Sequence, residues 1–294
     1  MSQEEYIKSG KIAGEALEFG KKLIKVNVSL LSVTEKIEDF IQKRGAGLAF
    51  PVQISLNSIA AHYTAYPDDK ITFQAGDIVK LDIGTHVKGC VGDTATTVEV
   101  STNKNTKLIE ASRKALDNAI KICTIGTKLR EIGRVIEKTI IDSGFKPIRN
   151  LTGHSVEEYS IHGGLVVPNY DNGDETELEE GVVIAIEPFA TNGDGLIKET
   201  KPSSIYKLEK RKPVRDSFSR KILEYIEKEF KTLPFSKRDL IKKFGMVNIP
   251  LSILEKEGII YQYPHLVEVA NGLVSQAEHT MVIDHKLVVT TKIN

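Results

Sequence analysis

The sequence predicts an α/β fold of the α+β kind, in which antiparallel strands are flanked by helices. One observation is a pair of strand-like segments, residues 78–83 and 93–100, whose connection is punctuated by Gly84, Gly89 and Gly92. The other is a set of segments whose apolar residues recur every three to four positions, as in amphipathic helices: residues 4–25, 105–123 and 127–143. Strands joined by tight turns and covered by such helices form an antiparallel sheet with helices on one face.

The first two helices follow from local signals. Residues 4–25 are amphipathic, and Ile7 is expected on the buried side. Ser32 and Glu35 resemble a capping box, which would open a second helix that runs to Arg44 before a glycine.

Two aspartates on the predicted strand pair suggest a functional site. If the chain turns near Val87 and Lys88, Asp82 and Asp93 face one another, with their Cβ atoms about 4.5–5.5 Å apart. Like charges at that separation destabilise a sheet, and a bound cation would compensate for the repulsion. Two exposed aspartates near a hairpin would give the same pattern, so the pair alone leaves both interpretations open.

Three further polar residues lie on or beside segments that read as buried strands. His154 follows the helix at 127–143, Glu187 ends a strand at 182–187, and Glu278 lies within a last strand at 275–283. An unpaired buried carboxylate costs several kcal/mol, so these acids need a partner. Four carboxylates and one imidazole suit a pair of divalent ions such as Mn, Fe or Co, whereas structural zinc favours cysteine.

In this order, the five residues resemble the metal ligands of the methionine aminopeptidase family, which has the pita-bread fold. Several local strings carry the resemblance: Ala61-His62-Tyr63-Thr64, Asp82-Ile-Gly, Gly89-x-x-x-Asp93-x-Ala95, Gly153-His154, Ile161-His162-Gly163-Gly164 and Ala185-Ile-Glu187-Pro-Phe. The chain resembles the type 2 branch, in an archaeal-like form without an N-terminal extension. Glu278 follows Glu187 by 91 positions, which leaves room for that branch's inserted helical subdomain.

The resemblance implies a dinuclear centre of Mn, Fe(II), Co or Zn and assigns its ligands. Asp93 and Glu278 would bridge the two ions, Asp82 would complete the shell of one ion, and His154 and Glu187 would complete the other. The reaction implied is attack of a metal-activated water on the first peptide bond of a protein chain.

The resemblance also implies catalytic and specificity roles. Glu187 would carry the proton from the nucleophile to the leaving amine, while His62 and His162 would donate hydrogen bonds to the scissile peptide and the developing oxyanion. Four residues match the family's apolar methionine pocket, although ordinary core residues would look the same: Phe50, Ile161, Tyr263 and Leu266. The remaining histidines are expected to be structural: His86, His265, His279 and His285.

The chain divides into a catalytic domain, residues 1–197 plus 265–294, and an insertion, residues 198–264. The insertion holds 16 Lys or Arg and 9 Asp or Glu. Its three short helical segments and one extended segment, with Ser236 as a helix cap, resemble a winged helix. Four basic residues on or near one predicted helix are candidates for a phosphate-binding face: Lys237, Arg238, Lys242 and Lys243. We favour the alternative that these side chains form the solvated face of a packed insertion.

Composition excludes several classes of protein. Forty basic and 40 acidic residues leave no formal net charge, and two cysteines are too few for a disulfide scaffold. No apolar run approaches the roughly 18 residues that span a membrane, and the first residues lack a signal-peptide core. We therefore expect a cytoplasmic monomer that acts on nascent polypeptides and binds no membrane and no defined nucleic-acid sequence, with ribosome binding left open.

Three functions compete at this point. The first is removal of the initiator methionine ahead of a small second residue. The second is the Xaa-Pro cleavage of prolidase or aminopeptidase P, which usually carry a large N-terminal domain; only 81 residues precede Asp82. The third is a catalytically silent adaptor that binds nucleic acid or the ribosome through the basic insertion. Such adaptors have typically lost metal ligands, and this chain keeps all five.

Overall fold

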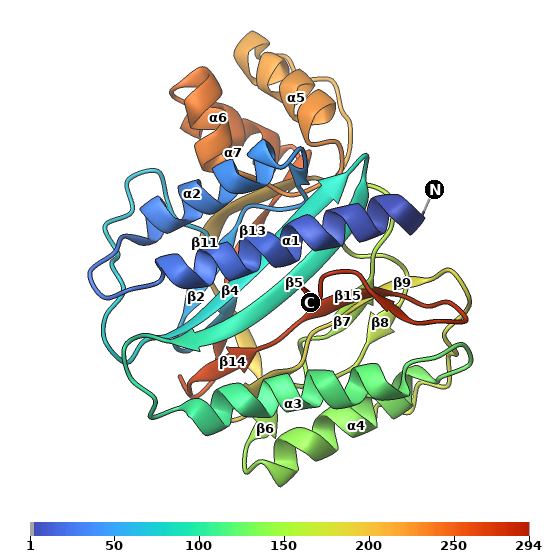
Figure 1. Ribbon diagram of the computed structural model, residues 1–294. Coiled ribbons are helices and arrows are strands. Elements are labelled where there is room, and N and C mark those ends of the chain that lie inside the picture. The colour runs from blue at the N-terminus through green and yellow to red at the C-terminus, as the bar shows by residue number, and fades with distance from the viewer. Residues whose placement is uncertain (1–2, 294) are drawn as a thin grey trace.

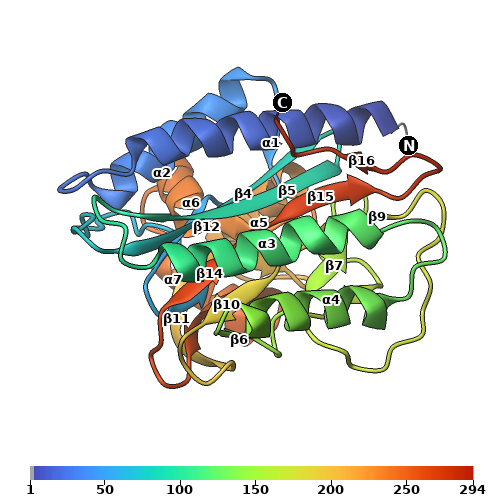
Figure 2. The ribbon, with the colours of Figure 1, turned by 60° about the horizontal axis from the view of Figure 1, so that its bottom comes forward.

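Two pairs of helices cover the outside of a curled set of antiparallel strands (Figure 1). The computed structural model describes residues 3–293. Helices α1 (Gln3–Leu23) and α2 (Leu30–Lys43) cover one half of the sheet, and α3 (Thr106–Ile122) and α4 (Leu129–Asp142) cover the other, as Figure 2 shows from a second direction. Each half buries its own apolar cluster between helices and strands.

Within residues 3–293 the strands form four small sheets. In the first half they are β1 (Gly47–Leu48), β2 (Gln53–Leu56), β3 (Ile59–Ala61), β4 (Ile78–Val87) and β5 (Cys90–Glu99). In the second half they are β6 (Lys146–Pro147), β7 (Gly153–Ser155), β8 (Val166–Val167), β9 (Val183–Ile186), β10 (Phe189–Thr191), β14 (Val274–Gln276), β15 (His279–Val282) and β16 (Val288–Val289). No helix within residues 3–293 is long and apolar enough to cross a membrane.

The hairpin of β4 and β5 turns one residue later than the sequence predicts. Lys88 and Gly89 form the turn, both with positive φ, as a two-residue hairpin loop of this kind requires. A turn centred on Val87 would force a β-branched residue into that region. Asp82 therefore pairs with Ala95 rather than with Asp93. The predicted direct opposition of the two aspartates is wrong; they are diagonal neighbours on one face, as far apart as roughly 7–8 Å.

The last predicted strand, 275–283, is also interrupted. It divides into β14 and β15, and Glu278 lies in the break between them. The partner strand has a matching break, because Glu187 lies between β9 and β10, which pair with β15 and β14. Both glutamates thus lie where the chain passes from one sheet to the other.

The start of the chain differs from the prediction in two details. Ile7 is 40% exposed rather than buried. The second helix begins at Leu30, and its N-cap is Ser29, whose side chain accepts a hydrogen bond from the Ser32 N–H. Ser32 and Glu35 lie inside the helix, so the predicted capping box is wrong.

The last third of the chain contains a separate group of helices, which lies at the top of Figure 1. Strands β11 (Ile197–Leu208) and β13 (Ile260–Glu268) pair with each other and lead to and from this group, and β12 (Phe235–Ser236) pairs with β11. The helices are α5 (Ser217–Glu229), α6 (Lys237–Phe244) and α7 (Asn248–Lys256). They enclose an apolar cluster of their own. Ser236 caps α6, as predicted. The likeness to a winged helix stays a prediction.

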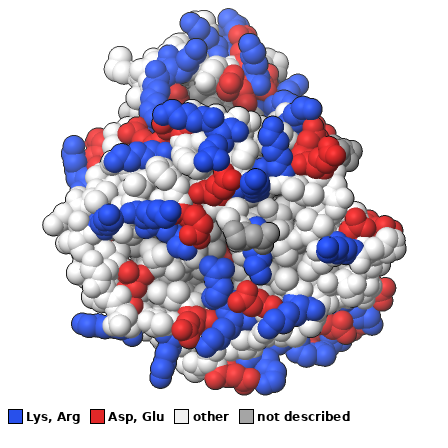
Figure 3. All heavy atoms as spheres, in the orientation of Figure 1, with Lys and Arg blue, Asp and Glu red and all other residues white. Residues whose placement is uncertain are grey.

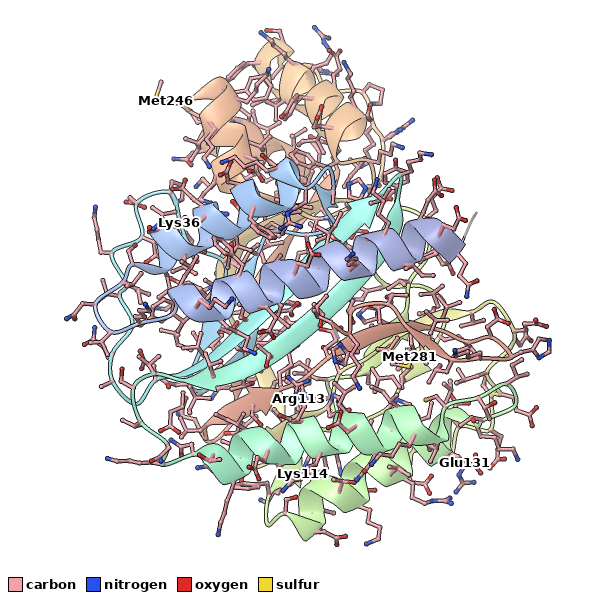
Figure 4. The ribbon with its side chains drawn as sticks, in the orientation of Figure 1. Lys36, Arg113, Lys114, Glu131, Met246 and Met281 are labelled. Atoms are coloured by element: carbon pink, nitrogen blue, oxygen red, sulfur yellow. The ribbon has the colours of Figure 1, made fainter. Side chains whose placement is uncertain are left out.

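One member of the expected basic face is not on the surface. Arg238 is 2% exposed and forms an ion pair with Glu38 of α2, so it belongs to the contact between α6 and the first half. On the face drawn in Figure 3, Lys and Arg are interspersed with Asp and Glu, including over the helical group at the top. Figure 4 shows Met246 pointing away from the molecule at the tip of this group, and the residue is 90% exposed.

Candidate metal centre and active site

The five predicted metal ligands meet at one cavity inside the curled sheet. Their supporting elements come from both halves: β4 and β5 carry the two aspartates, β7 carries the histidine, and the two strand breaks carry the glutamates. The cavity has a volume of about 310 Å³, and all five line it: Asp82, Asp93, His154, Glu187 and Glu278. The neighbours of Asp82 along β4 point the other way, into the cluster beneath α1 and α2, so strand alternation places the carboxylate inside.

Three of these side chains already lie at the spacing of a metal site. One ligand atom each from Asp93, His154 and Glu278 lie within 4.8 Å of one another. The His154 Nε2 atom is 3.9 Å from Asp93 Oδ2 and 3.7 Å from Glu187 Oε1. Burial lowers the pKa of His154 to about 3, so the ring is neutral and these approaches are not ion pairs.

The second ring nitrogen of His154 fixes its tautomer. Nδ1 lies 3.3 Å from the backbone carbonyl of Ser155. A carbonyl oxygen only accepts, so Nδ1 carries the proton and the lone pair of Nε2 faces the carboxylates. Metal-binding histidines are oriented in this way.

The acids of the cavity are buried, and three of them keep an oxygen atom that accepts no hydrogen bond in the described chain. Burial first, and mutual repulsion second, raises the pKa of Asp93 and Glu278 well above the ordinary range, and burial raises that of Asp82 to about 7. One buried oxygen on each of these three residues has no hydrogen-bond partner in the described chain. Oxygen atoms that are buried, repelled and unpartnered, beside an imidazole lone pair, fit divalent cations.

The motif analysis missed a neutral residue at this centre. The Gln276 side-chain amide lies 3.4 Å from both Asp82 Oδ2 and Glu187 Oε2. It is 1% exposed and its Nε2–H groups face one oxygen of each acid. Gln276 precedes Glu278 by two residues, so the period of a strand was the signal that could have revealed it.

Both predicted catalytic histidines line the cavity. Burial lowers the pKa of His62 to about 4, and its Nδ1 lies 3.1 Å from the Pro264 carbonyl oxygen. Nδ1 therefore carries the proton, and Nε2 is left as an acceptor. The geometry contradicts the predicted donor role of His62 and suits acceptance of a hydrogen bond from an amide N–H. His162 is exposed at the cavity, and its ring lies edge-on to that of His154 with centroids 4.6 Å apart.

The four residues of the predicted apolar pocket also line this cavity: Phe50, Ile161, Tyr263 and Leu266. The Phe50 ring lies directly against Gly84, where an added Cβ would come within 2.2 Å of it. This close approach explains the glycine two residues after Asp82. Two cavity residues from the inserted region were not predicted, Ile205 and Pro234.

The remaining histidines lie apart from the cavity lining. His279 contacts Thr291 on the opposite face of its strand. The ring of His86 lies beside Tyr159, the ring of His265 lies beside Tyr63, and His285 lies beside Glu180.

Residues 4–248 match the model of metallopeptidase family M24. The chain belongs to this family. It is 46% identical over 294 residues to a methionine aminopeptidase of Pyrococcus abyssi, with 99% of each chain covered. It is 44% identical to a methionine aminopeptidase of Archaeoglobus fulgidus, with 99% of this chain and 98% of the relative covered.

Solved structures confirm the pita-bread fold. A methionine aminopeptidase from Thermotoga maritima superposes with a TM-score of 0.72 at 22% identity, covering 100% of this chain and 98% of the other. A structure described as a thermophilic Arx1 gives a TM-score of 0.87 at 17% identity, with 100% and 92% covered. The prolidase from Pyrococcus furiosus gives 0.65 at 19% identity, and this chain spans 65% of its length. At these identities the structures establish the fold alone.

Proposed function

We propose that this protein removes the N-terminal methionine from polypeptides whose second residue is small. The observation that carries the proposal is the complete set of five ligand side chains around one cavity, in a member of family M24 that is 46% identical to a methionine aminopeptidase. Complete ligands argue against a silent adaptor, and the full-length similarity to methionine aminopeptidases argues against an Xaa-Pro peptidase.

The five ligands would hold two divalent ions, Mn, Fe(II), Co or Zn. When bound, such ions polarise the scissile carbonyl and supply a nucleophilic water near neutral pH. Glu187 is proposed to pass the proton to the leaving amine. Its side chain keeps 15% exposure, more than the 5% of Asp93, so of these two acids it is the more accessible to a substrate. A carboxylate in reach of the reacting atoms can both take and release a proton.

The histidines are proposed to orient the peptide. His62 presents Nε2, and we propose that it accepts a hydrogen bond from the scissile amide N–H, which holds the bond in line for attack. His162, across the cavity, is proposed to donate to the developing oxyanion.

The apolar side of the cavity is proposed to receive the methionine side chain, between Phe50, Ile161, Tyr263 and Leu266. A thioether fits such a pocket through many weak contacts. A pocket of this kind discriminates by shape, so substrates that differ by a few heavy atoms should differ by about 10- to 200-fold in kcat/KM.

We further propose that residues 198–264 form a subdomain whose role is to wall this pocket. The proposal is supported by its separate apolar cluster and by its contribution of Tyr263 to the cavity. We also propose that the protein works as a cytoplasmic monomer on nascent chains; ribosome binding stays a prediction.

The test is cleavage of four peptides by the purified protein loaded with Mn²⁺: Met-Ala-Ser, Met-Leu-Ser, N-acetylated Met-Ala-Ser and an Xaa-Pro peptide. Met-Ala-Ser should lose its methionine at least about tenfold faster than Met-Leu-Ser, and acetylation of the α-amine should abolish cleavage. Activity that survives a chelator, or a preference for Xaa-Pro peptides, would refute the proposal.

A further inference from the structure

We propose that Arg238 of the insertion is a positioning residue for His62, with Glu38 and Thr64 as its partners. The inference rests on the proposed function, since His62 is taken to contact the substrate. It assigns the insertion a second role, distinct from walling the pocket.

His62 has a backbone conformation that needs support. Its φ is +67°, in the left-handed region that side chains other than glycine and asparagine rarely adopt. The His62 N–H donates to Gln53 Oε1 at 2.6 Å, and its Nδ1–H donates to the Pro264 carbonyl. The ring also lies edge-on to Tyr263, with centroids 5.1 Å apart. The direction of the Nε2 lone pair therefore depends on contacts from β2 and β13.

The residues that follow His62 are held by Arg238. Its Nη1 donates to Thr64 Oγ1 at 3.1 Å and also to the Ala65 carbonyl oxygen. Thr64 Oγ1 in turn donates to the Val52 carbonyl oxygen at 2.8 Å. Arg238 is thus tied to the segment that begins two residues after the histidine and to the strand that carries Gln53.

Burial makes this arrangement rigid. Arg238 is 2% exposed, Glu38 is 5% exposed and Thr64 is fully buried. The Arg238 Nη2 group donates to Glu38 Oε1, so the same guanidinium bonds α2 on one side and the His62 segment on the other. A guanidinium suits this position because its planar fork directs several N–H groups at fixed angles.

A second ion pair between the same two helices offers a matched control. Lys242 of α6 lies 3.1 Å from Glu35 of α2, but both side chains are exposed, at 58% and 44%. Among the described residues, no hydrogen bond or ion pair joins Lys242 or Glu35 to residues 61–65. If the insertion merely needs attachment to α2, both pairs serve that purpose, but only the Arg238 pair also contacts the segment that follows His62.

The test is the double variant Glu38→Leu with Arg238→Met. Apolar side chains of similar volume often replace a buried ion pair without loss of stability, whereas removing one partner leaves a buried charge. The double variant loses the donors to Thr64 and Ala65. We expect kcat for Met-Ala-Ser to fall about 10- to 100-fold, the scale of a small misplacement of a catalytic group, with KM within about threefold and two metal ions per chain retained.

Two other variants complete the design. Thr64→Val keeps the ion pair and removes only the hydroxyl, so it carries the test if the double variant does not fold; it should lower kcat in the same direction by a smaller factor. Lys242→Met should retain the wild-type kcat.

A readout independent of activity separates this inference from the proposed function. In ¹⁵N-labelled protein, the His62 nitrogens should show a single tautomer with Nδ1 protonated, and the double variant should show tautomer averaging. If the wild type does not cleave methionine peptides while the tautomer still responds, the proposed function fails and the positioning role stands. An unchanged kcat and tautomer in the folded variants, or an equal loss in Lys242→Met, would overturn the inference.

Discussion

Buried carboxylates in this protein differ in their hydrogen-bond donors and in the direction of their pKa shifts. Glu268, at the end of β13, has no exposed surface, yet its two oxygens accept hydrogen bonds from four backbone N–H groups: those of Asp194, Gly195, Ala270 and Gly272. Burial opposes its ionisation, but these donors outweigh burial and lower the pKa of Glu268. The close approach also requires Gly193, where an added Cβ would lie 2.3 Å from the carboxylate.

The acids of the metal centre have fewer donors than Glu268 has. Asp82, Asp93 and Glu278 each keep a buried oxygen without a hydrogen-bond partner in the described chain. Burial raises the pKa of all three, and repulsion by neighbouring acids raises the pKa of Asp93 and Glu278 further. The difference separates a carboxylate that completes the fold from carboxylates that require a cation from solution. Burial alone does not mark a functional acid; a buried carboxylate oxygen that keeps no hydrogen-bond partner does.

The largest expected effect is the difference in activity between two substitutions, one at an acid of the metal centre and one at Glu268. Glu278→Gln removes a proposed bridging charge and should lower kcat by more than about 10³-fold, with a loss of bound metal. Glu268→Gln removes the charge from a hydrogen-bonded site. It should keep metal content and kcat within about threefold while lowering the free energy of unfolding by about 1–3 kcal/mol.

Peptide cleavage, elemental analysis and urea unfolding of both variants measure this contrast. A Glu278→Gln protein with full activity and full metal content would show that the site is misplaced. A Glu268→Gln protein that loses its metal would show that the two groups are not independent.

A second, smaller effect is the pH dependence of the metal-free protein. Asp82 has an ordinary pKa of 3.8 and a folded-state pKa of about 7. Between these values the folded state binds more protons than the unfolded state, so stability contributed by this group falls as pH rises. Glu268 has the opposite sign, because its lowered pKa stabilises the fold above the ordinary value and this stability is lost on acidification.

Unfolding in chelator between pH 5 and 8 tests these signs. Glu278→Gln relieves repulsion among the acids, so without metal it should become more stable than the wild type as pH rises, by on the order of 1 kcal/mol. Metal should stabilise the wild type progressively more over the same range, since ligands bind metal when deprotonated. A metal-free wild type that steadily gains stability from pH 5 to 7 relative to Glu278→Gln would contradict this account.

The same contrast explains how much the sequence could predict. The five ligands were predicted because acids on strand-like segments are conspicuous and their order matched a known family. The register of Asp82 and Asp93 was predicted wrongly, because moving the turn by one residue changes the partner of every residue in the two strands. The positive φ of Lys88, which sets the turn, was not anticipated.

Residues whose roles depend on distant neighbours could not be predicted locally. Arg238 lies among lysines in the sequence, and its partner Glu38 is 200 residues away. Charge patterning therefore assigned it to the surface. Gln276 and Gln53 carry no charge that would attract attention. Only the fold brings Gln276 to the acids of the centre and Gln53 to the backbone of His62. Local patterns identify residue types, whereas burial and partners emerge from tertiary packing.

The smallest expected effect concerns charges that are solvated rather than buried. Lys243 is exposed on α6 and Lys237 is partly exposed, while neither forms an ion pair with the described residues. Reversing both charges, Lys237→Glu with Lys243→Glu, should leave kcat/KM for Met-Ala-Ser within about twofold, because exposed charges interact weakly through water.

Any binding of the protein to a nucleic acid should weaken as the salt concentration rises and should show no sequence preference, since contacts to phosphates position the partner without reading its sequence. Fluorescence anisotropy with two unrelated duplexes at two salt concentrations measures this. Tight binding of one defined sequence at physiological salt, lost on reversing these two charges, would instead make the insertion a recognition surface.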